Sequence, residues 1–155
     1  MRNTIADFSK AVRGSTIKRL QLIPSGYENW NISENAMSIA DIAQHLVDTD
    51  TWLFKKLVNH HLEPITGKAG STNIRRRSEY DAIIDKLKET GETRYKLILG
   101  DLDLNQLIYD SRFNGEVTAL WIILRGNLDH EIHHRGQLTA YIRVLQDSGQ
   151  MPSDA

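Results

Sequence analysis

The stretch VTALWIILRGNLDHEIHHRGQLTAYIRVLQ, residues 117–146, decides the fold of this chain. Its apolar residues recur at steps of three and four, which is the spacing of one face of an α-helix, and no proline interrupts it. The recurring positions are Leu120, Trp121, Leu124, Leu128, Leu138, Tyr141, Ile142 and Leu145. The spacing therefore predicts a long and largely buried helix over residues 117–146.

Two histidines, His130 and His134, are separated by one helical turn within this stretch. On a helix they lie one above the other on the same face. Two imidazoles at that spacing can bind one metal ion in adjacent coordination positions. His133 points about 100° away around the helix, so it is the weaker candidate ligand.

Composition and charge narrow the class of protein. The chain has 155 residues, of which 40% are hydrophobic and 25% charged, as in a soluble globular domain, and we predict a single domain over residues 1–155. The net charge of -1 gives no global basic field for nucleic acid or an anionic membrane. Without cysteine there is no disulfide, thiolate metal site or cysteine nucleophile. With no membrane-length apolar run and no signal-peptide pattern, we predict a cytoplasmic protein.

Three more helices are predicted upstream, over residues 3–22, 38–59 and 78–99. Residues 101–116 are predicted to be a linker, in which an Asn114-Gly115 turn could join two short extended pieces. Four long helices with long connections on both sides of the third favour an all-α four-helix bundle.

His45 lies within the apolar stripe of the second predicted helix. It is either a hydrogen-bonded core residue or a ligand pointing into the bundle, where such folds build metal sites from facing helices. With His130 and His134 it would supply three nitrogen ligands and leave one coordination position open, which is the layout of a catalytic site. If the three histidines are satisfied core residues instead, the bundle is purely structural and binds no metal.

The same region matches a competing pattern, because His130-Glu131-Ile132-His133-His134 fits the H-E-x-x-H sequence of metalloproteases. The extended form of that pattern needs a third histidine at the position of Ala140, and no glutamate follows Glu131. The chain is also small for a cleft that grips a polypeptide. We therefore do not favour a protease.

Two segments resemble the DinB-like (YfiT-like) family of metal-dependent enzymes. Residues 127–143 carry H-x-x-x-H-R-G-Q at positions 130–137, similar to the signature on the last helix of that family. Residues 38–46, followed by acidic residues and Trp52, are similar to its first histidine motif. Order and separation both match, so the resemblance covers nearly the whole chain. It implies an up-down-down-up four-helix bundle, a homodimer, and a divalent ion held by His45, His130 and His134.

The resemblance also implies a class of reaction. Members of the family resemble S-transferases that use bacillithiol or related low-molecular-weight thiols and, more remotely, mycothiol-dependent isomerases. A divalent ion would activate a thiol or water for attack on a small molecule, in a transferase-like or hydrolase-like reaction. Zinc or nickel is the preferred ion, with iron or copper as alternatives. The alternative function is a non-catalytic metal-binding bundle for stress response. No catalytic residue beyond the ion's ligands is predicted.

The sequence also suggests roles for several residues near the motifs, some with two interpretations. Gly136 is expected to let a neighbouring helix approach closely, and Arg135 is expected to form a structural ion pair. The basic run Arg75-Arg76-Arg77 is either a solvated surface or a group that steers an anionic substrate. Three polar residues either support the site or merely pack between helices: Asp48, Asn127 and Gln137.

Overall fold

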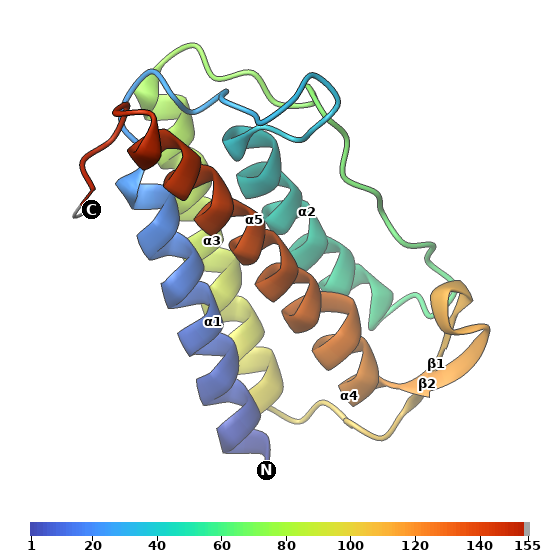
Figure 1. Cartoon of the computed structure of the whole chain (residues 1–155). Coiled ribbons are helices and arrows are strands. Elements are labelled where there is room, and N and C mark those ends of the chain that lie inside the picture. The colour runs from blue at the N-terminus through green and yellow to red at the C-terminus, as the bar shows by residue number, and fades with distance from the viewer. Residues whose placement is uncertain (154–155) are drawn as a thin grey trace.

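Four long helical runs dominate the computed structural model, which describes residues 1–153 (Figure 1). The first three are α1 (Arg2–Leu22), α2 (Ile39–Lys56) and α3 (Arg77–Leu99). The fourth run has three parts, α4 (Ala119–Trp121), η2 (Ile122–Leu128) and α5 (Asp129–Asp147). The four helices predicted from the sequence are thus present. The last two residues of the domain predicted over 1–155 lie outside the described part of the chain.

A capping box starts α2 where the sequence predicts it. The Ser38 hydroxyl accepts from the Asp41 backbone N–H at 3.0 Å, and the Asp41 carboxylate accepts from the Ser38 backbone N–H at 2.8 Å. The helix ends at Lys56 rather than at residue 59. The buried Lys56 ammonium donates to the carbonyls of His60 and Leu62, which turns the chain back over the helix end.

A β-hairpin precedes the last helical run, so the chain is mostly helical but not purely α. Strand β1 (Leu107–Asp110) pairs antiparallel with β2 (Gly115–Thr118), and η1 (Ser111–Phe113), a 3₁₀ turn, joins them. Asn114 adopts the left-handed conformation with φ 54°, as expected of an Asn-Gly turn. Because β2 extends to Thr118, the last helical run begins at Ala119 and not at residue 117.

The segment η2 is π-helical, which the sequence analysis did not predict. At its end the Asp129 N–H donates to the Leu124 carbonyl, five residues back instead of four. A π-helical turn inserts an extra residue into a helix and is often found at functional sites. Here it lies directly before His130, the first histidine of α5.

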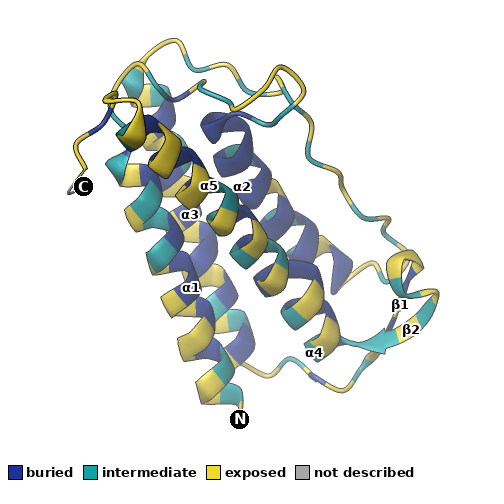
Figure 2. Ribbon diagram, viewed as in Figure 1, coloured by how far each residue is buried: buried dark blue, intermediate teal, exposed yellow. Residues whose placement is uncertain are grey.

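The helices turn their buried faces toward one another (Figure 2). Their buried apolar residues form two clusters. One cluster includes Leu20, Ile42 and Leu138, and the other lies toward the hairpin and includes Leu53 and Ile108. Helix α1 packs on α3 and α5, while α2 packs on α3, η2 and α5. Within residues 1–153, no helix has the length and apolarity needed to cross a membrane.

The connection from α2 to α3, residues 57–76, travels along the outside of the molecule from the hairpin end to the opposite end (Figure 1). Asp41 ties it to the start of α2, because its carboxylate accepts from the Gly70 N–H at 2.8 Å and the Thr72 N–H at 2.7 Å. Gly67 lies close to the His45 ring, since a Cβ built on it would be 3.2 Å from Cδ2. The long connection is therefore held against the residues around His45.

Candidate metal centre

The structure brings the three candidate ligands together between α2 and α5. The Nε2 atom of His130 lies 3.1 Å from that of His45 and 3.0 Å from that of His134. The ligand nitrogens of all three residues lie within 4.8 Å of one another, and each pair of rings is close to perpendicular. This three-histidine group is called the triad below.

The donor atoms of the triad fit a divalent ion. Nitrogen ligands of zinc bind at about 2.0–2.1 Å, so two of them in a tetrahedral site are separated by about 3.3 Å, close to the distances in the triad. The Gln137 Oε1 can only accept, so the 2.7 Å bond from His134 places the proton on Nδ1 and leaves Nε2 with its lone pair. This orientation of a ligand histidine by a neighbouring acceptor is common in metal sites. His130 Nδ1 is buried and has no hydrogen-bond partner within residues 1–153.

Burial keeps the triad uncharged. Desolvation lowers the pKa of His45, although Asp48 acts to raise it. Desolvation and the neighbouring histidines lower the pKa of His130 to about 3. Desolvation also lowers the pKa of His134 to about 4, against the effect of its bond to Gln137. All three imidazoles are therefore neutral at pH 7, which is the form that binds a metal.

The polar residues that were candidates to support the site differ in what they do. Gln137 contacts His134, as described. Asp48 is exposed, accepts from the Gln44 side chain at 2.9 Å and lies in the wall of a pocket beside His45. The Asn127 side chain accepts from Arg94 at 2.8 Å and donates to Asp50 at 3.2 Å, and it bonds to none of the three histidines. The helix-packing interpretation therefore describes Asn127.

A second group of buried polar residues lies beside the triad, and the sequence analysis did not predict it. It consists of Arg13, Asp50, Arg94 and Glu131, each at most 4% exposed, and is called the charge cluster below. Arg13 contacts Asp50 and Glu131, both at 2.8 Å. Arg94 contacts Asp50 at 3.1 Å and Glu131 at 2.7 Å. The four charges come from α1, α2, α3 and α5, so no local spacing could have revealed them.

The charge cluster excludes the metalloprotease interpretation. Burial acts to raise the pKa of Glu131, but the hydrogen bonds and charges of Arg13 and Arg94 lower it to about 2. Both carboxylate oxygens are bonded to these arginines, at 2.7–2.9 Å. Glu131 therefore cannot serve as the general base that the H-E-x-x-H pattern requires.

Two cavities adjoin the triad on the side of the long connection. The larger, of about 360 Å³, is lined by His45, Asp48, Thr51, Trp52, Lys55, Leu62, Ile65 and Thr66. The smaller, of about 30 Å³, is lined by Thr49, Trp52, Ile65, Arg112, Gly126 and His130. Trp52 and Ile65 belong to both walls. A small molecule in the larger cavity would thus lie beside the triad.

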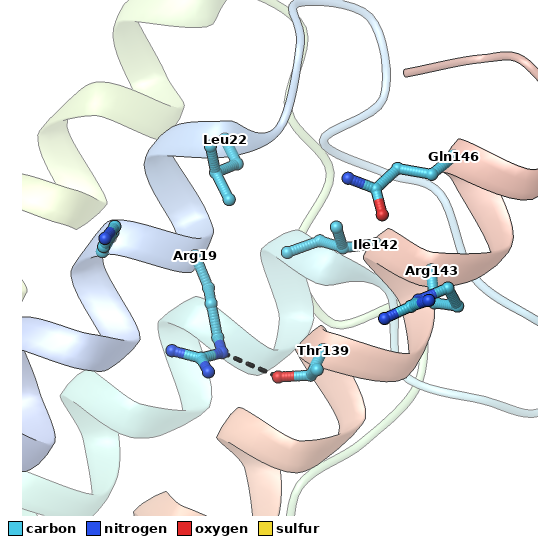
Figure 3. Close-up of a pocket in the computed structure, with 7 residues that line it drawn as sticks. Arg19, Leu22, Thr139, Ile142, Arg143 and Gln146 are labelled. Carbon is cyan, nitrogen blue, oxygen red and sulfur yellow. Dashed lines mark hydrogen bonds between the residues drawn. The ribbon is translucent and has the colours of Figure 1, made fainter. Parts of the chain in front are cut away.

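A separate groove of about 260 Å³ lies between α1 and α5 (Figure 3). Arg19 reaches across it from α1, and its Nε donates to the Thr139 hydroxyl at 2.7 Å. Its other lining residues are Lys18, Leu22, Ile142, Arg143 and Gln146. Because this lining includes neither a histidine nor a carboxylate, the groove is not the candidate metal centre.

Three other expectations have clear outcomes. A Cβ on Gly136 would meet nothing within 4 Å, so the expected close approach of a neighbouring helix is wrong. Arg135 forms no ion pair with any residue in the described range 1–153. Arg77 pairs with Glu28 at 3.0 Å, donates to the Ile23 carbonyl and stacks on Tyr80, so it holds the α3 N-terminus to the connection between α1 and α2.

The fold and the triad define a class of protein, a helical bundle with three inward histidines that could hold one metal ion. The model of the DinB family matches residues 1–148, so the chain belongs to the DinB family. A solved structure, that of the DinB-like protein YjoA from Bacillus subtilis, has the same fold with a TM-score of 0.65. It is 17% identical, and the match covers 92% of each chain. No curated protein matches the sequence.

Proposed function

We propose that this chain is a divalent-metal-dependent enzyme on an all-α, up-down-down-up bundle, with the ion held by His45, His130 and His134. The observation that carries the proposal is the convergence of three neutral imidazoles, with the Nε2 atom of His130 at 3.1 Å from that of His45 and 3.0 Å from that of His134. When bound, the ion would lower the pKa of a thiol or water in its open position for attack on a small electrophilic molecule. Zinc or nickel is the preferred ion, and iron or copper is the alternative.

The residues of the chain prepare the site for this role. Gln137 fixes the tautomer of His134, and burial keeps the three imidazoles unprotonated. The cavity of about 360 Å³ beside His45 has the size of a small-molecule site. These features support a transferase-like reaction with a low-molecular-weight thiol, or a hydrolase-like reaction with water.

The proposal includes a cytoplasmic homodimer that acts on a small molecule and binds neither nucleic acid nor membrane. Light scattering on a size-exclusion column measures the oligomeric state directly. A non-catalytic metal-binding bundle is the alternative function, and the cavity beside the triad favours the enzyme over it.

The test is elemental analysis of tag-free protein beside the double variant His130→Ala/His134→Ala. The matched control is His60→Ala/His61→Ala, which removes two histidines outside the triad. We expect near-stoichiometric metal in the parent and the control, and none in the triad variant. No metal in the parent after reconstitution with zinc or nickel would overturn the proposal. Metal without turnover in thiol-transfer and hydrolase screens would favour the non-catalytic alternative.

A further inference from the structure

Arg112 comes from the hairpin and lines the same small cavity as His130. It lies on η1, in the connection of the hairpin, yet its side chain forms part of the wall of the small cavity that His130 also lines. Trp52 of α2 is another residue of this wall. The hairpin therefore brings a guanidinium to the edge of the candidate metal centre.

The guanidinium is held in a fixed position. Its Nε and Nη2 donate to the two carboxylate oxygens of Asp110 at 2.9 and 2.8 Å, and Asp110 is fully buried. Its Cζ lies 4.5 Å from the centroid of the Trp52 ring, a cation–π contact. A cation that is already ordered loses little further entropy when it binds an anion.

Gly126 leaves room for the same guanidinium and lies closest to its Nη2 atom. A Cβ on Gly126 would lie 2.9 Å from Nη2 of Arg112 and 3.6 Å from Nη1, so a larger residue would press on the charged group. Gly126 belongs to the π-helical segment η2 and lines the small cavity. The π-helical segment before His130 thus has a glycine at the position where the Arg112 guanidinium packs against it.

Part of the guanidinium has no partner in the protein. Asp110 occupies the Nε–Nη2 edge, whereas Nη1 donates to no residue in the described range 1–153. The side chain is 33% exposed, so the protein does not fully cover it. An arginine with one edge anchored and the other open can bind a planar anion such as a carboxylate.

We propose that Arg112 is a specificity-determining residue, which binds a carboxylate on the substrate while the reactive group of the substrate lies at the triad. The inference rests on the proposed function and names the substrate class, which is a small molecule with a carboxylate. Arg112 takes no part in the chemical step. It selects and positions the substrate through its open edge.

The test compares two thiols that differ in charge, 3-mercaptopropionate and its neutral analogue 3-mercaptopropanamide, by calorimetric titration of zinc-loaded protein. The parent is expected to bind the carboxylate about ten- to a hundredfold more tightly, the range for a charge-assisted hydrogen bond. In Arg112→Met this preference is expected to fall to about one, with the affinity for the amide unchanged. The control Lys86→Met removes an exposed positive charge on α3 that lines neither cavity, and should keep the preference of the parent.

A second variant distinguishes a lost binding preference from misfolding. It is needed because Arg112→Met leaves the buried Asp110 carboxylate without its main partner. Asp110→Asn/Arg112→Met removes that charge too, and it should show the same loss of preference. Zinc content and melting temperature are measured for every variant. A parent that binds zinc but shows no preference, or a preference that survives in both variants, would overturn the role of Arg112 and leave the metal site standing. A parent that binds no zinc would overturn the proposed function, and this inference with it.

Discussion

The triad and the charge cluster lie side by side in the bundle interior, and they meet at the sequence neighbours His130 and Glu131. In the charge cluster two arginines face two carboxylates, and each carboxylate bonds to both arginines. In the triad three neutral imidazoles face one another, and among residues 1–153 the Nε2 atoms of His45 and His134 bond only to that of His130. The first group satisfies its own charges, whereas the second has a geometry that could hold a metal ion.

The two groups should therefore respond differently to mutation. Removing one member of a buried ion pair leaves a charge without compensation, which is strongly destabilising. Removing a neutral imidazole leaves no charge behind. We expect the charge cluster to control folding, and the triad to control metal binding.

The largest effect is expected from Arg94→Met. It leaves Asp50 and Glu131 with Arg13 as their only arginine, so we expect the free energy of unfolding to fall by about 3–5 kcal/mol. Urea unfolding of metal-free protein measures it, with Lys86→Met as a surface control that should stay within about 0.5 kcal/mol of the parent. A loss for Arg94→Met as small as that of the control would remove the distinction between the two groups.

The next largest effect is the response to metal. Zinc at about 100–1,000 times its dissociation constant should raise the free energy of unfolding by about 2.7–4.1 kcal/mol. His130→Ala/His134→Ala should abolish this increase, since it removes two of the three ligands. Thermal unfolding with zinc and with a chelator measures the increase. Equal stabilisation of parent and variant would place the binding site elsewhere.

A smaller effect is expected at the residue that orients a ligand. Gln137→Leu removes the acceptor of His134 Nδ1, so zinc affinity should fall about 10- to 100-fold, as is typical of such partners. Competition with a chromophoric chelator measures the affinity. Gln146→Leu, on the same helix but in the groove of Figure 3, should bind zinc as the parent does. If both variants matched the parent, the His134–Gln137 bond would not contribute to metal affinity.

The smallest effect is expected at Asp41, which anchors the long connection beside His45. Burial acts to raise the pKa of Asp41, but hydrogen bonds from Ser38, Gly70 and Thr72 hold it below its ordinary value of 3.8. A carboxyl with a lowered pKa stabilises the fold above pH 3.8, and this contribution is lost as the pH falls through the folded-state pKa. Asp41→Asn should therefore cost about 1–2 kcal/mol at neutral pH.

Urea unfolding at several pH values checks whether the contribution of Asp41 to the free energy of unfolding decreases as the pH falls. The difference in unfolding free energy between parent and Asp41→Asn should be largest near neutral pH and should shrink in acid. A difference that grows as the pH falls would contradict the assignment of a lowered pKa to Asp41.

The parts of the fold that could be predicted from the sequence are those with a local pattern. Apolar periodicity predicted the four helices, Ser38 and Asp41 marked the start of α2, and Asn114-Gly115 marked the turn of the hairpin. The triad could be proposed because His130 and His134 are one turn apart on a helix, and because His45 lies within the apolar stripe of the second helix, an assignment that the family resemblance also implied.

The remaining features depend on contacts between distant segments. The charge cluster takes one member from each of four helices, and Arg112 lines a cavity with His130 only because the hairpin folds against α2. The π-helical segment is a change in the hydrogen-bond register of the backbone, which apolar spacing does not reveal. At Gly136 a local pattern led to a wrong prediction. A glycine within a motif suggested close packing of a neighbouring helix, but the structure has open space there.

The π-helical segment fixes the angular phase between two halves of the site. Residues before η2 carry the hairpin and with it Arg112, whereas residues after η2 carry His130 and His134. If the same residues formed a regular α-helix, the surplus residue would rotate one half by about 100° relative to the other. The two histidines would keep their spacing, but the hairpin would leave the helix in a new direction. The π-helical turns thus set the direction in which the hairpin, and Arg112 with it, leaves the helix. They do so without changing the spacing of the two histidines.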